Sequence, residues 1–499
     1  MATVLVVAAT LLSGCGSLTR PAPQPRANPA AAAEFADTLR QQVTLDAMMA
    51  HLAKFQEIAD THGGNRALGT PGYQASLDYV VNALRDKGFD VETPEFDVRL
   101  PWADEPSLTV AGDTVTARPL EYTIGTESRG PDGADIVAAP LVPARAEDTP
   151  GCTASDYDGL PVDGAVVLVD RGSCPFGQKQ TVAAERGAVA LIVANNEDGD
   201  EMGGTLGRST EVQIPVISVT KAAGAQLRGQ QGAPVTIQLN AGVRVEKSRN
   251  VIAQTTTGST ANTVMVGAHL DSVAEGPGIN DNGSGVSAVL ETALQLGSSP
   301  PIRNAVRFGF WGAEEVGLLG SRNYVESLDV DGLRDIALYL NFDMLASPNP
   351  GYFTYDGNQS TKPGAREGVP RVPEGAAGIE RTLVDYLDRE GKSSQDTSFD
   401  GRSDYDNFTK SGVPAGGLFS GGDGEKSVQQ AELWGGTAGE PFDPSYHTEA
   451  DTLDNVDPTA MEILGGGVAY SVGLYAQHQG GRNGIPARED RTRHQLTES

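Results

Sequence analysis

Two histidines and several carboxylates stand at the ends of short apolar runs, beside turns rich in Gly, Pro and Asp. The residues concerned are His269, Asp271, Asp281, Glu314, Glu315, Asp343, Tyr446 and His447. Neutral imidazoles and carboxylates are typical zinc ligands. Taken alone, His269 is better explained as an ordinary hydrogen-bonded histidine. The other acids and His447 favour a metal site, because adjacent carboxylates at strand ends are costly unless a cation compensates them.

Three apolar runs must position these groups. Residues 264–268 (VMVGA), 303–311 (RNAVRFGFW) and 336–344 (IALYLNFDM) have the length and composition of buried strands. A helical apolar pattern follows the Gly-rich loop after Asp281. Strands that alternate with helices predict an open α/β sheet, whose ligands bind at the carboxyl edge.

Five candidate ligands carry nitrogen or oxygen and none is a thiolate: His269, Asp281, Glu315, Asp343 and His447. Such a set suits two zinc ions about 3.5–4 Å apart with one bridging carboxylate, as in two-metal aminopeptidases. Glu314 remains free to act as a base. Asp271, two residues beyond His269, is placed to orient the imidazole.

The motifs H-x-D, N-D-N-G-S-G, G-A-E-E-x-G-L-x-G-S, N-F-D-M and Y-H-T-E-A-D-T follow in this order between Val264 and Thr452. As a set they resemble the M28 family of zinc aminopeptidases, and most closely its bacterial secreted and lipoprotein members. The resemblance implies an α/β zinc-exopeptidase fold, with a central mixed sheet flanked by helices and an inserted β-rich protease-associated (PA) domain.

The resemblance also implies roles for single residues. His269 and Asp343 would hold one zinc ion, Glu315 and His447 the other, and Asp281 would bridge them. Glu314 would be the general base and Tyr446 would donate a hydrogen bond to the tetrahedral oxyanion. In the family a cis peptide follows the bridging aspartate, here the bond from Asp281 to Asn282.

Two further residues are candidates for substrate binding. Arg402 matches a residue of the family's G-R-S-D segment that lines the substrate site, although Tyr405 stands where a histidine is common. Phe419, at the end of the apolar run 414–419, is a candidate wall for the substrate's first side chain. Plain core packing explains Phe419 equally well.

The change from helical to short β-rich patterns near residues 106 and 247 delimits the insert. V-D-R-G-S-C-P-F and A-L-I-V-A-N-N resemble a PA domain, which would shape access to the site or contact larger substrates; a spacer is an equal alternative. The expected organisation is a signal peptide at 1–14, a lipidated tether at 15–35, peptidase parts at 36–105 and 248–480, the insert at 106–247 and a disordered tail at 481–499.

Local patterns predict several elements outside the motifs. Apolar spacing predicts helix throughout 36–62, alternation predicts a strand over 89–98 that starts the peptidase sheet, and Pro and Gly predict surface loops over 351–374.

The net charge of −29, from 37 basic and 66 acidic residues, argues against nucleic acid as a partner. Residues 4–14 form an apolar run of signal-peptide length, and Leu12 to Cys15 match the bacterial lipobox, which implies a lipid on Cys15 and membrane anchoring outside the cell or secretion. Cys152 and Cys174 remain, and an exported compartment permits a disulfide. Two buried free thiols are the alternative.

The sequence thus predicts an exported di-zinc aminopeptidase that removes N-terminal, mainly apolar, residues from peptides with a free N-terminus. Two alternatives stay open. One is another M28-type activity, that of a carboxypeptidase or a glutaminyl cyclase. The other is a non-catalytic peptide-binding lipoprotein, a class in which metal ligands are usually lost.

Overall fold

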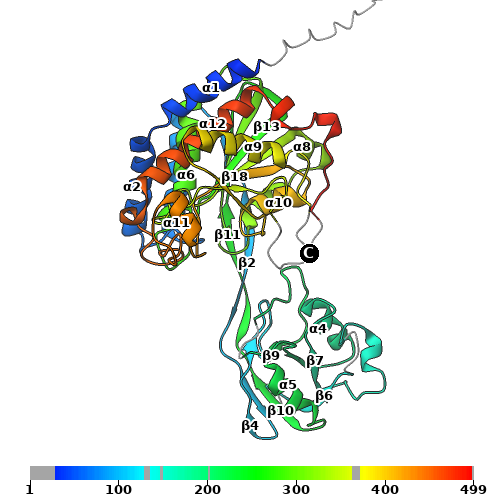
Figure 1. The fold of residues 1–499 in the computed structure, drawn as a ribbon. Coiled ribbons are helices and arrows are strands. Elements are labelled where there is room, and N and C mark those ends of the chain that lie inside the picture. Colours follow the sequence, from blue (N-terminus) through cyan, green and yellow to red (C-terminus); the bar gives the residue numbers. More distant parts are fainter. Residues whose placement is uncertain (1–27, 128–134, 146–149, 200–202, 362–370, 497–499) are drawn as a thin grey trace, which may run out of the picture.

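The computed structural model describes residues 28–127, 135–145, 150–199, 203–361 and 371–496. They form a large α/β domain and a small β-rich domain, joined by a ribbon of two antiparallel strands (Figure 1). The ribbon pairs β2 (Glu95–Ala103) with β11 (Ala241–Arg249) over their whole length. The predicted signal peptide, Cys15 and most of the predicted tether lie outside the described residues.

The large domain is built on an eight-stranded mixed sheet. Its order is β1 (Val91–Glu92), β12 (Val251–Gln254), β14 (Asn304–Trp311), β13 (Ser259–His269), β15 (Ile336–Phe342), β18 (Ala415–Phe419), β16 (Phe353–Tyr355) and β17 (Gln395–Thr397). The four central strands, β14, β13, β15 and β18, are parallel to one another. The predicted fold, a central mixed sheet with a β-rich insert, is confirmed.

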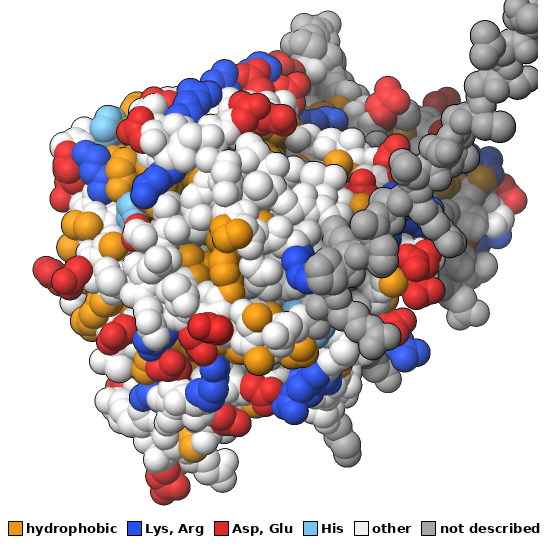
Figure 2. Space-filling model, turned by 90° about the horizontal axis from the view of Figure 1, so that it is seen from above, with side chains coloured by type: hydrophobic (Ala, Val, Ile, Leu, Met, Phe, Trp, Pro, Cys, Tyr) orange, Lys and Arg blue, Asp and Glu red, His pale blue; other side chains and the backbone are white. Residues whose placement is uncertain are grey.

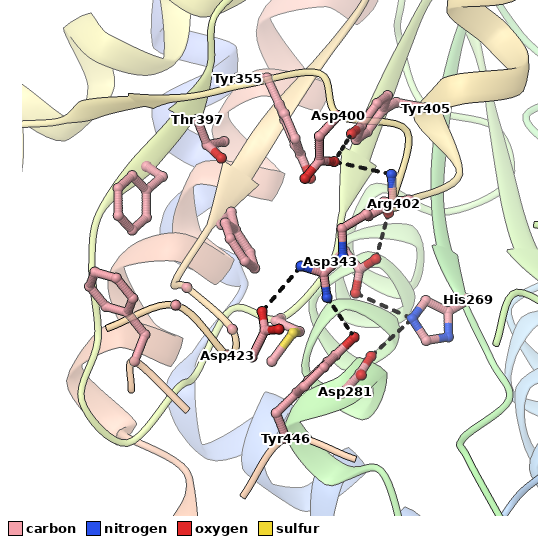
Figure 3. A pocket seen from close by; sticks show the side chains of 18 of the residues that line it. His269, Asp281, Asp343, Tyr355, Thr397, Asp400, Arg402, Tyr405, Asp423 and Tyr446 are labelled. Atoms are coloured by element: carbon pink, nitrogen blue, oxygen red, sulfur yellow. Dashed lines mark hydrogen bonds and ion pairs between the residues drawn. The ribbon is translucent and has the colours of Figure 1, made fainter. Parts of the chain in front are cut away.

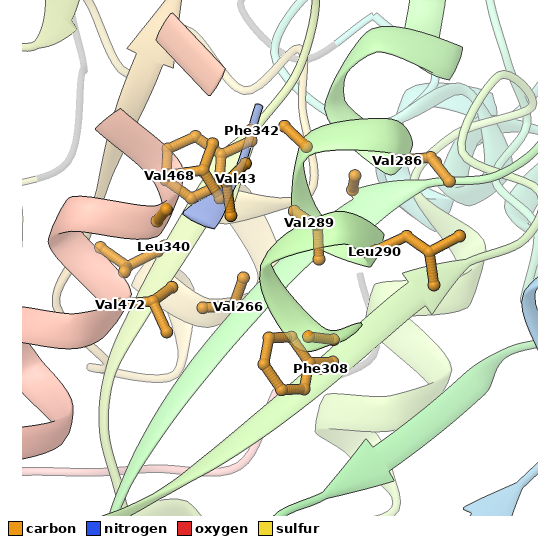
Figure 4. Close-up of a cluster of buried hydrophobic side chains, with 14 of the residues drawn as sticks. Val43, Val266, Val286, Val289, Leu290, Phe308, Leu340, Phe342, Val468 and Val472 are labelled. Atoms are coloured by element: carbon orange, nitrogen blue, oxygen red, sulfur yellow. The ribbon is translucent and has the colours of Figure 1, made fainter. Parts of the chain in front are cut away.

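Helices cover both faces of this sheet. On one face lie α1 (Pro29–Gln42), α2 (Leu45–Thr61), α3 (Pro71–Asp86), α6 (Gly285–Leu296), α9 (Ala376–Arg389) and α12 (Pro458–Gln477). On the other lie α7 (Leu319–Glu326), α8 (Val330–Asp335) and α10 (Tyr405–Lys410). The side chains of β13 alternate between the two cores: Val266 packs with α6 and α12 (Figure 4), whereas Met265 points to the other face.

The N-terminal segment differs from the prediction in two respects. Helix begins inside the predicted tether, and two helices replace the single helix predicted over 36–62. Helix α1 begins at Pro29, because the side chain of Asn28 caps its first turn and Ala-rich sequence favours helix. Ala32, Ala36 and Leu39 are buried where α1 runs beside α12. The helical run then breaks at Val43, and α2 starts from its own cap at Thr44.

The strand expected over 89–98 is divided. Val91 and Glu92 pair with β12 in the large sheet, and after Thr93 and Pro94 the chain leaves that sheet as β2 of the ribbon. Proline has no N–H to donate to a ladder, which accounts for the break. Only the first part of the expected strand therefore belongs to the large sheet.

The small domain has its own eight-stranded sheet and core. The order is β4 (Asp113–Thr114), β3 (Ser107–Val110), β10 (Pro234–Gln238), β6 (Val137–Pro143), β7 (Val166–Asp170), β8 (Ala190–Ala194), β9 (Val216–Val219) and β5 (Arg118–Pro119). Helices α4 (Phe176–Glu185) and α5 (Lys221–Arg228) pack on it. Cys152 and Cys174 form a disulfide, with their Cα atoms 5.9 Å apart.

Two segments expected to be loop or disordered are ordered. Phe353–Tyr355 is the buried strand β16, because aromatic and Thr side chains there fill both faces of the sheet edge. The C-terminal segment is fixed by two buried arginines: Arg491 donates to the carbonyls of Ala261 and Arg334, and Arg493 to those of Leu333 and Ile336. These bonds outweigh the polar composition that suggested a free tail.

The carboxyl edge of the large sheet lies on the side of the ribbon. Val251, two residues after the ribbon strand β11, pairs with Phe310 at the end of β14, so β14 and the strands parallel to it end towards the small domain. Among the described residues, no helix is long and apolar enough to cross a membrane. On the face in Figure 2, acidic and basic side chains are interspersed.

Candidate metal centre

The five predicted ligands meet at this carboxyl edge. Figure 3 shows three of them, His269, Asp281 and Asp343. His269 ends β13, Asp343 follows β15, and Glu314 and Glu315 follow β14. Asp281 lies in the turn Ile279–Ser284 that precedes α6, and its peptide bond to Asn282 is cis, as the family resemblance implied. His447 comes from the loop before α12. Residues far apart in the sequence are thus held together by the ends of neighbouring strands.

One carboxylate stands between the two imidazoles. Oδ1 of Asp281 lies 3.1 Å from Nε2 of His269, and Oδ2 lies 3.2 Å from Nε2 of His447. Asp343 approaches Nε2 of His269 at 3.2 Å, and Glu315 approaches Nε2 of His447 at 3.1 Å. The geometry therefore contains two groups of N and O donors that share Asp281.

Asp271 orients the histidine, but through its backbone. Nδ1 of His269 lies 3.0 Å from the carbonyl oxygen of Asp271 and 3.9 Å from its carboxylate. The carboxylate instead accepts the backbone N–H groups of Glu314, at 3.1 Å, and Glu315, at 3.3 Å. The bond at Nδ1 leaves Nε2 with a lone pair towards the ligand cluster, and the carboxylate fixes the Glu-Glu turn.

The backbone is left-handed at three non-glycine residues beside the ligands. These are Ala313, before Glu314, with φ 59°, Met344, after Asp343, with φ 56°, and His447 itself, with φ 56°. Such conformations are uncommon for these residues and persist where surrounding contacts determine them. They turn the chain sharply just after β14 and β15 and in the loop that carries His447.

The cluster has strongly shifted proton affinities. Burial raises the pKa of Glu315 to about 7, with a further contribution from Asp281. Burial acts to lower the pKa of His447, but its hydrogen bonds with Asp281 and Glu315 outweigh this and raise it to about 10. Burial also raises the pKa of Glu314, against the opposing effect of His269. Positive charge stabilises this cluster, in which four carboxylates surround two imidazoles: Asp281, Glu314, Glu315 and Asp343 around His269 and His447.

The donor set fits a metal. Oε1 of Glu315 is buried and has no hydrogen-bond partner. Both oxygens of Asp281 and one oxygen each of Asp343 and Glu315 face imidazole nitrogens, which bind metals when neutral. One ligand atom each of His269, Asp281 and Glu315 lie within 4.8 Å of one another, so these residues could bind one ion. The same is true of His269, Glu314 and Asp343.

Several residues that support the ligands were not predicted. Asp451 accepts the backbone N–H of Asn280 at 2.7 Å and of Asp281 at 3.0 Å. Ser403 donates to the second oxygen of Asp343. Asp451 lies in the motif Y-H-T-E-A-D-T and Ser403 in the motif G-R-S-D. These motifs could therefore have indicated both supporting residues.

Arg66 is the other unpredicted support. It is fully buried and donates to the carbonyls of Leu270 at 2.6 Å, Pro277 at 2.9 Å and Gly278 at 2.6 Å. Its guanidinium thus closes the loop between His269 and Asp281. An arginine in the turn-rich stretch 65–73 gave no sequence signal for this role.

A cavity of about 260 Å³ opens beside the ligands (Figure 3). One side is formed by His269, Asp281, Glu314, Glu315 and Asp343, and the other by the apolar side chains of Met344, Phe353, Tyr355, Phe419 and Phe442. Phe419 therefore lines the cavity, although its ring also lies 6.1 Å from that of Phe353.

Arg402 and Tyr446 stand together at the edge of this cavity. Nη2 of Arg402 donates to the phenol oxygen of Tyr446 at 3.3 Å, and Nη1 pairs with Asp423 at 3.1 Å. The ring of Tyr446 stacks on that of His447, with centroids 3.8 Å apart. Because Arg402 occupies an acceptor site of the phenol, the O–H of Tyr446 remains able to donate.

The small domain reaches the same edge of the sheet. A second cavity of about 550 Å³ is lined by Tyr122 and Arg208 of the small domain and by Val316 and Gly317, which follow Glu315 directly. The insert therefore lies next to the turn that carries both glutamates.

Comparison with known proteins identifies the family. The sequence profile described as "Peptidase family M28" matches residues 250–472, and that of the "PA domain" matches 137–227. The chain is 66% identical over 491 residues, 98% of its length and 96% of the relative's, to the "Probable lipoprotein aminopeptidase LpqL" of Mycobacterium tuberculosis. The chain belongs to peptidase family M28. It is a hydrolase of the peptidase class, as the motifs predicted.

A further relative and two solved structures are also similar to this chain. An "Aminopeptidase" of Pseudomonas aeruginosa is 40% identical over 84% of this chain and 78% of its own. The fold is shared with the solved "Aminopeptidase from Aneurinibacillus sp. strain AM-1", at a TM-score of 0.64 and 24% identity, over 88% of this chain and 95% of that one. The solved structure of "BSAP, a zinc aminopeptidase from Bacillus subtilis" matches with a TM-score of 0.54 and 24% identity, over 89% of this chain and 98% of that one.

Proposed function

We propose that this M28 peptidase is an exported aminopeptidase that uses two zinc ions to remove apolar residues from the N-terminus of peptides. The single observation that supports it best is the position of Asp281, whose two oxygens lie 3.1 Å and 3.2 Å from the Nε2 atoms of His269 and His447. A carboxylate between two imidazoles is the arrangement that a bridged two-metal site requires.

The ligand assignment follows the contacts. His269 and Asp343 would hold one zinc ion, Glu315 and His447 the other, and Asp281 would bridge them. Nitrogen and oxygen donors without thiolate suit zinc. The Bacillus subtilis protein that shares this fold is named a zinc aminopeptidase, which supports the choice of the same metal here.

Zinc bound at this site would lower the pKa of a water towards neutrality and polarise the substrate carbonyl. Glu314 would take a proton from the attacking water and pass it to the departing amine. Its side chain is buried, lies 3.9 Å from Nε2 of His269, and has a raised pKa because burial disfavours its charge. A carboxylate of raised pKa is a more effective base near neutral pH.

Tyr446 would bind the oxyanion that forms when water adds to the peptide carbonyl. Arg402 donates to its phenol oxygen, so the phenol O–H can point at the substrate. Arg402 thereby positions Tyr446 and adds positive charge near the developing negative charge.

The first residue of the substrate would be bound between two carboxylates and a group of aromatic rings. Glu314 and Asp343 would hold the α-ammonium group, whose charge they complement. The side chain would enter the part of the cavity formed by Phe353, Phe419 and Phe442, which favours apolar residues. A peptide blocked at its N-terminus would lose the ammonium contact.

Export and anchoring rest on the sequence and on a relative. The M. tuberculosis relative is named a lipoprotein aminopeptidase, and Leu12 to Cys15 match a lipobox. We therefore propose that Cys15 carries a lipid and holds the enzyme at the outer side of the cell membrane, where peptides are its partners.

One assay separates this function from the alternatives. The enzyme is offered a leucyl peptide with a free N-terminus, the same peptide N-acetylated, and a peptide with N-terminal Gln, each before and after chelation and zinc addition. The account predicts hydrolysis of the leucyl peptide with a free N-terminus only. The chelator should abolish this hydrolysis, and zinc should restore it. Equal cleavage of the acetylated peptide, cyclisation of the Gln peptide alone, or full activity without metal would contradict it.

A further inference from the structure

A second group of carboxylates lies behind the wall of the substrate cavity. Asp356 follows β16, Glu380 lies on α9 and Asp396 lies on β17, and one oxygen of each is within 4.8 Å of those of the other two. Asp356 and Glu380 are only 6% and 7% exposed. Asp396 is partly exposed. Two buried carboxylates beside a third are costly unless a cation compensates them.

No such cation comes from the residues that the structure describes. Across the ranges that the structure describes, none of the three carboxylates forms an ion pair with Lys, Arg or His; their partners are neutral donors. Asp356 accepts the backbone N–H groups of Ser360 and Thr361, each at 3.0 Å. Asp396 accepts the Thr361 hydroxyl at 2.6 Å.

Glu380 shows the effect of the uncompensated charge. It accepts the backbone N–H of Asn358 at 2.7 Å. Burial nevertheless raises its pKa, and the neighbouring Asp396 and Asp356 raise it further. The neutral donors thus compensate the negative charge of Glu380 only in part.

An unpaired hydroxyl lies on the same face of the sheet as these carboxylates. Thr354 is fully buried and its Oγ1 has no hydrogen-bond partner. Thr354 pairs in register with Asp396 in the parallel strands β16 and β17, so both side chains lie on one face of the sheet. Asp356, two residues along, extends the ladder by donating its N–H to the carbonyl of Thr397 at 2.8 Å, and therefore faces the same side.

We infer that Asp356, Glu380 and Asp396 bind a calcium ion, with the Thr354 hydroxyl bonded to the ion or to a water in its shell. The donors are all oxygen and come with three negative charges, which suits a hard cation and not zinc or copper. Calcium accepts irregular sets of six to eight oxygens, whereas magnesium demands near-octahedral geometry and keeps its water.

The ion would act as a clamp on the cavity wall. It would join β16, β17 and α9 on the face opposite Phe353 and Tyr355, which line the substrate cavity. This site is separate from the zinc ligands and does not depend on the proposed activity. Its failure would leave the zinc account intact.

The test uses the full-length, zinc-loaded enzyme after passage over a resin that removes loosely bound ions. Calorimetric titration with CaCl2 should show one ion bound per chain, and the melting temperature should rise with calcium concentration. The zinc content should not change, and MgCl2 should bind more weakly. Absence of both a saturable heat and a melting shift would overturn the proposal.

Variants locate the ion. Asp396→Asn removes one anionic ligand and should weaken calcium binding at least about tenfold, because affinity depends on the number of charged ligands. Glu380→Gln is the second variant, should the first fail to fold, and carries the same expectation. Asp388→Asn on the exposed side of α9 makes the same charge change and should bind as the wild type does. Wild-type affinity in both ligand variants would contradict the assignment.

Discussion

The carboxylate of Asp451 accepts the backbone N–H of Asp281 at 3.0 Å and that of the preceding Asn280 at 2.7 Å. It thereby connects the loop that carries His447 to the residue between the two imidazoles. Burial raises the pKa of Asp451 to about 7 in spite of these two bonds. Asp451 therefore supports the proposed metal site without being one of its proposed ligands.

Asp451→Asn should weaken zinc binding by roughly 10–100-fold, as is typical when the partner of a ligand is lost. The asparagine amide has one acceptor oxygen, so it can accept only one of the two backbone N–H groups of Asn280 and Asp281. Its NH2 group would face the other N–H, which is also a donor. Competition with a chromophoric chelator measures the affinity. Asp454→Asn, an exposed neighbour, is the matched control. Unchanged zinc affinity in Asp451→Asn would show that the bridge needs no such support.

Zinc binding should release protons and strengthen as pH rises. In the metal-free protein the pKa of His447 is raised to about 10 and that of Glu315 to about 7. Both groups must lose their protons to bind a metal, so at pH 7 zinc displaces at least the proton of His447. Titration of zinc into weakly buffered apo-protein, followed with a pH electrode, checks this. Binding without proton release would mean that His447 is already neutral.

The aromatic wall should determine which N-terminal residue is preferred. Phe442→Ala should lower kcat/KM for leucyl peptides by roughly 10–200-fold, the range expected when apolar contacts worth 1–3 kcal/mol are lost. Alanyl peptides, whose side chain is too short for this contact, should be affected far less. A parallel loss on both peptides would indicate general damage to the site. Phe419→Ala, at the end of β18, provides an independent test.

The disulfide should stabilise the small domain alone. Cys152 and Cys174 are 22 residues apart, and closing a loop of this length is worth about 3 kcal/mol in the chain-entropy account. The paired variant Cys152→Ser, Cys174→Ser should therefore melt earlier in the small domain while kcat and zinc content stay the same. Free thiols found by mass spectrometry in the exported protein would contradict the bond.

The sequence predicted which side chains come together better than it predicted their surroundings. His269, Glu315 and Asp343 stand at or just after the ends of apolar strands, and the parallel strands end at one edge. Asp281 and His447 lie in loops, and only the motifs indicated them. The prediction that Asp271 orients His269 described the contact only in part. The backbone carbonyl of Asp271, and not its carboxylate, accepts the contact from His269. The spacing of two residues could not distinguish the two oxygens.

Arg66, the ordered C-terminal segment and the helix α1 could not be predicted for a related reason. Their order depends on partners distant in the sequence: the carbonyls of the loop after His269, those near Leu333, and the side of α12. Composition predicts a tether or a tail where such tertiary partners are not visible. Buried arginines that bind backbone carbonyls leave no periodic pattern.

The roles of the two adjacent glutamates provide the most direct test of the account. Glu314→Gln and Glu315→Gln are prepared as matched variants, and zinc per chain and kcat on a leucyl peptide are measured for both. Glu314→Gln should keep the wild-type zinc content and lose roughly 10²–10⁴-fold in kcat, because it removes an acid–base group. Glu315→Gln should lose zinc. If Glu314→Gln lost zinc while Glu315→Gln kept its full content, the assignment of base and ligand would be wrong.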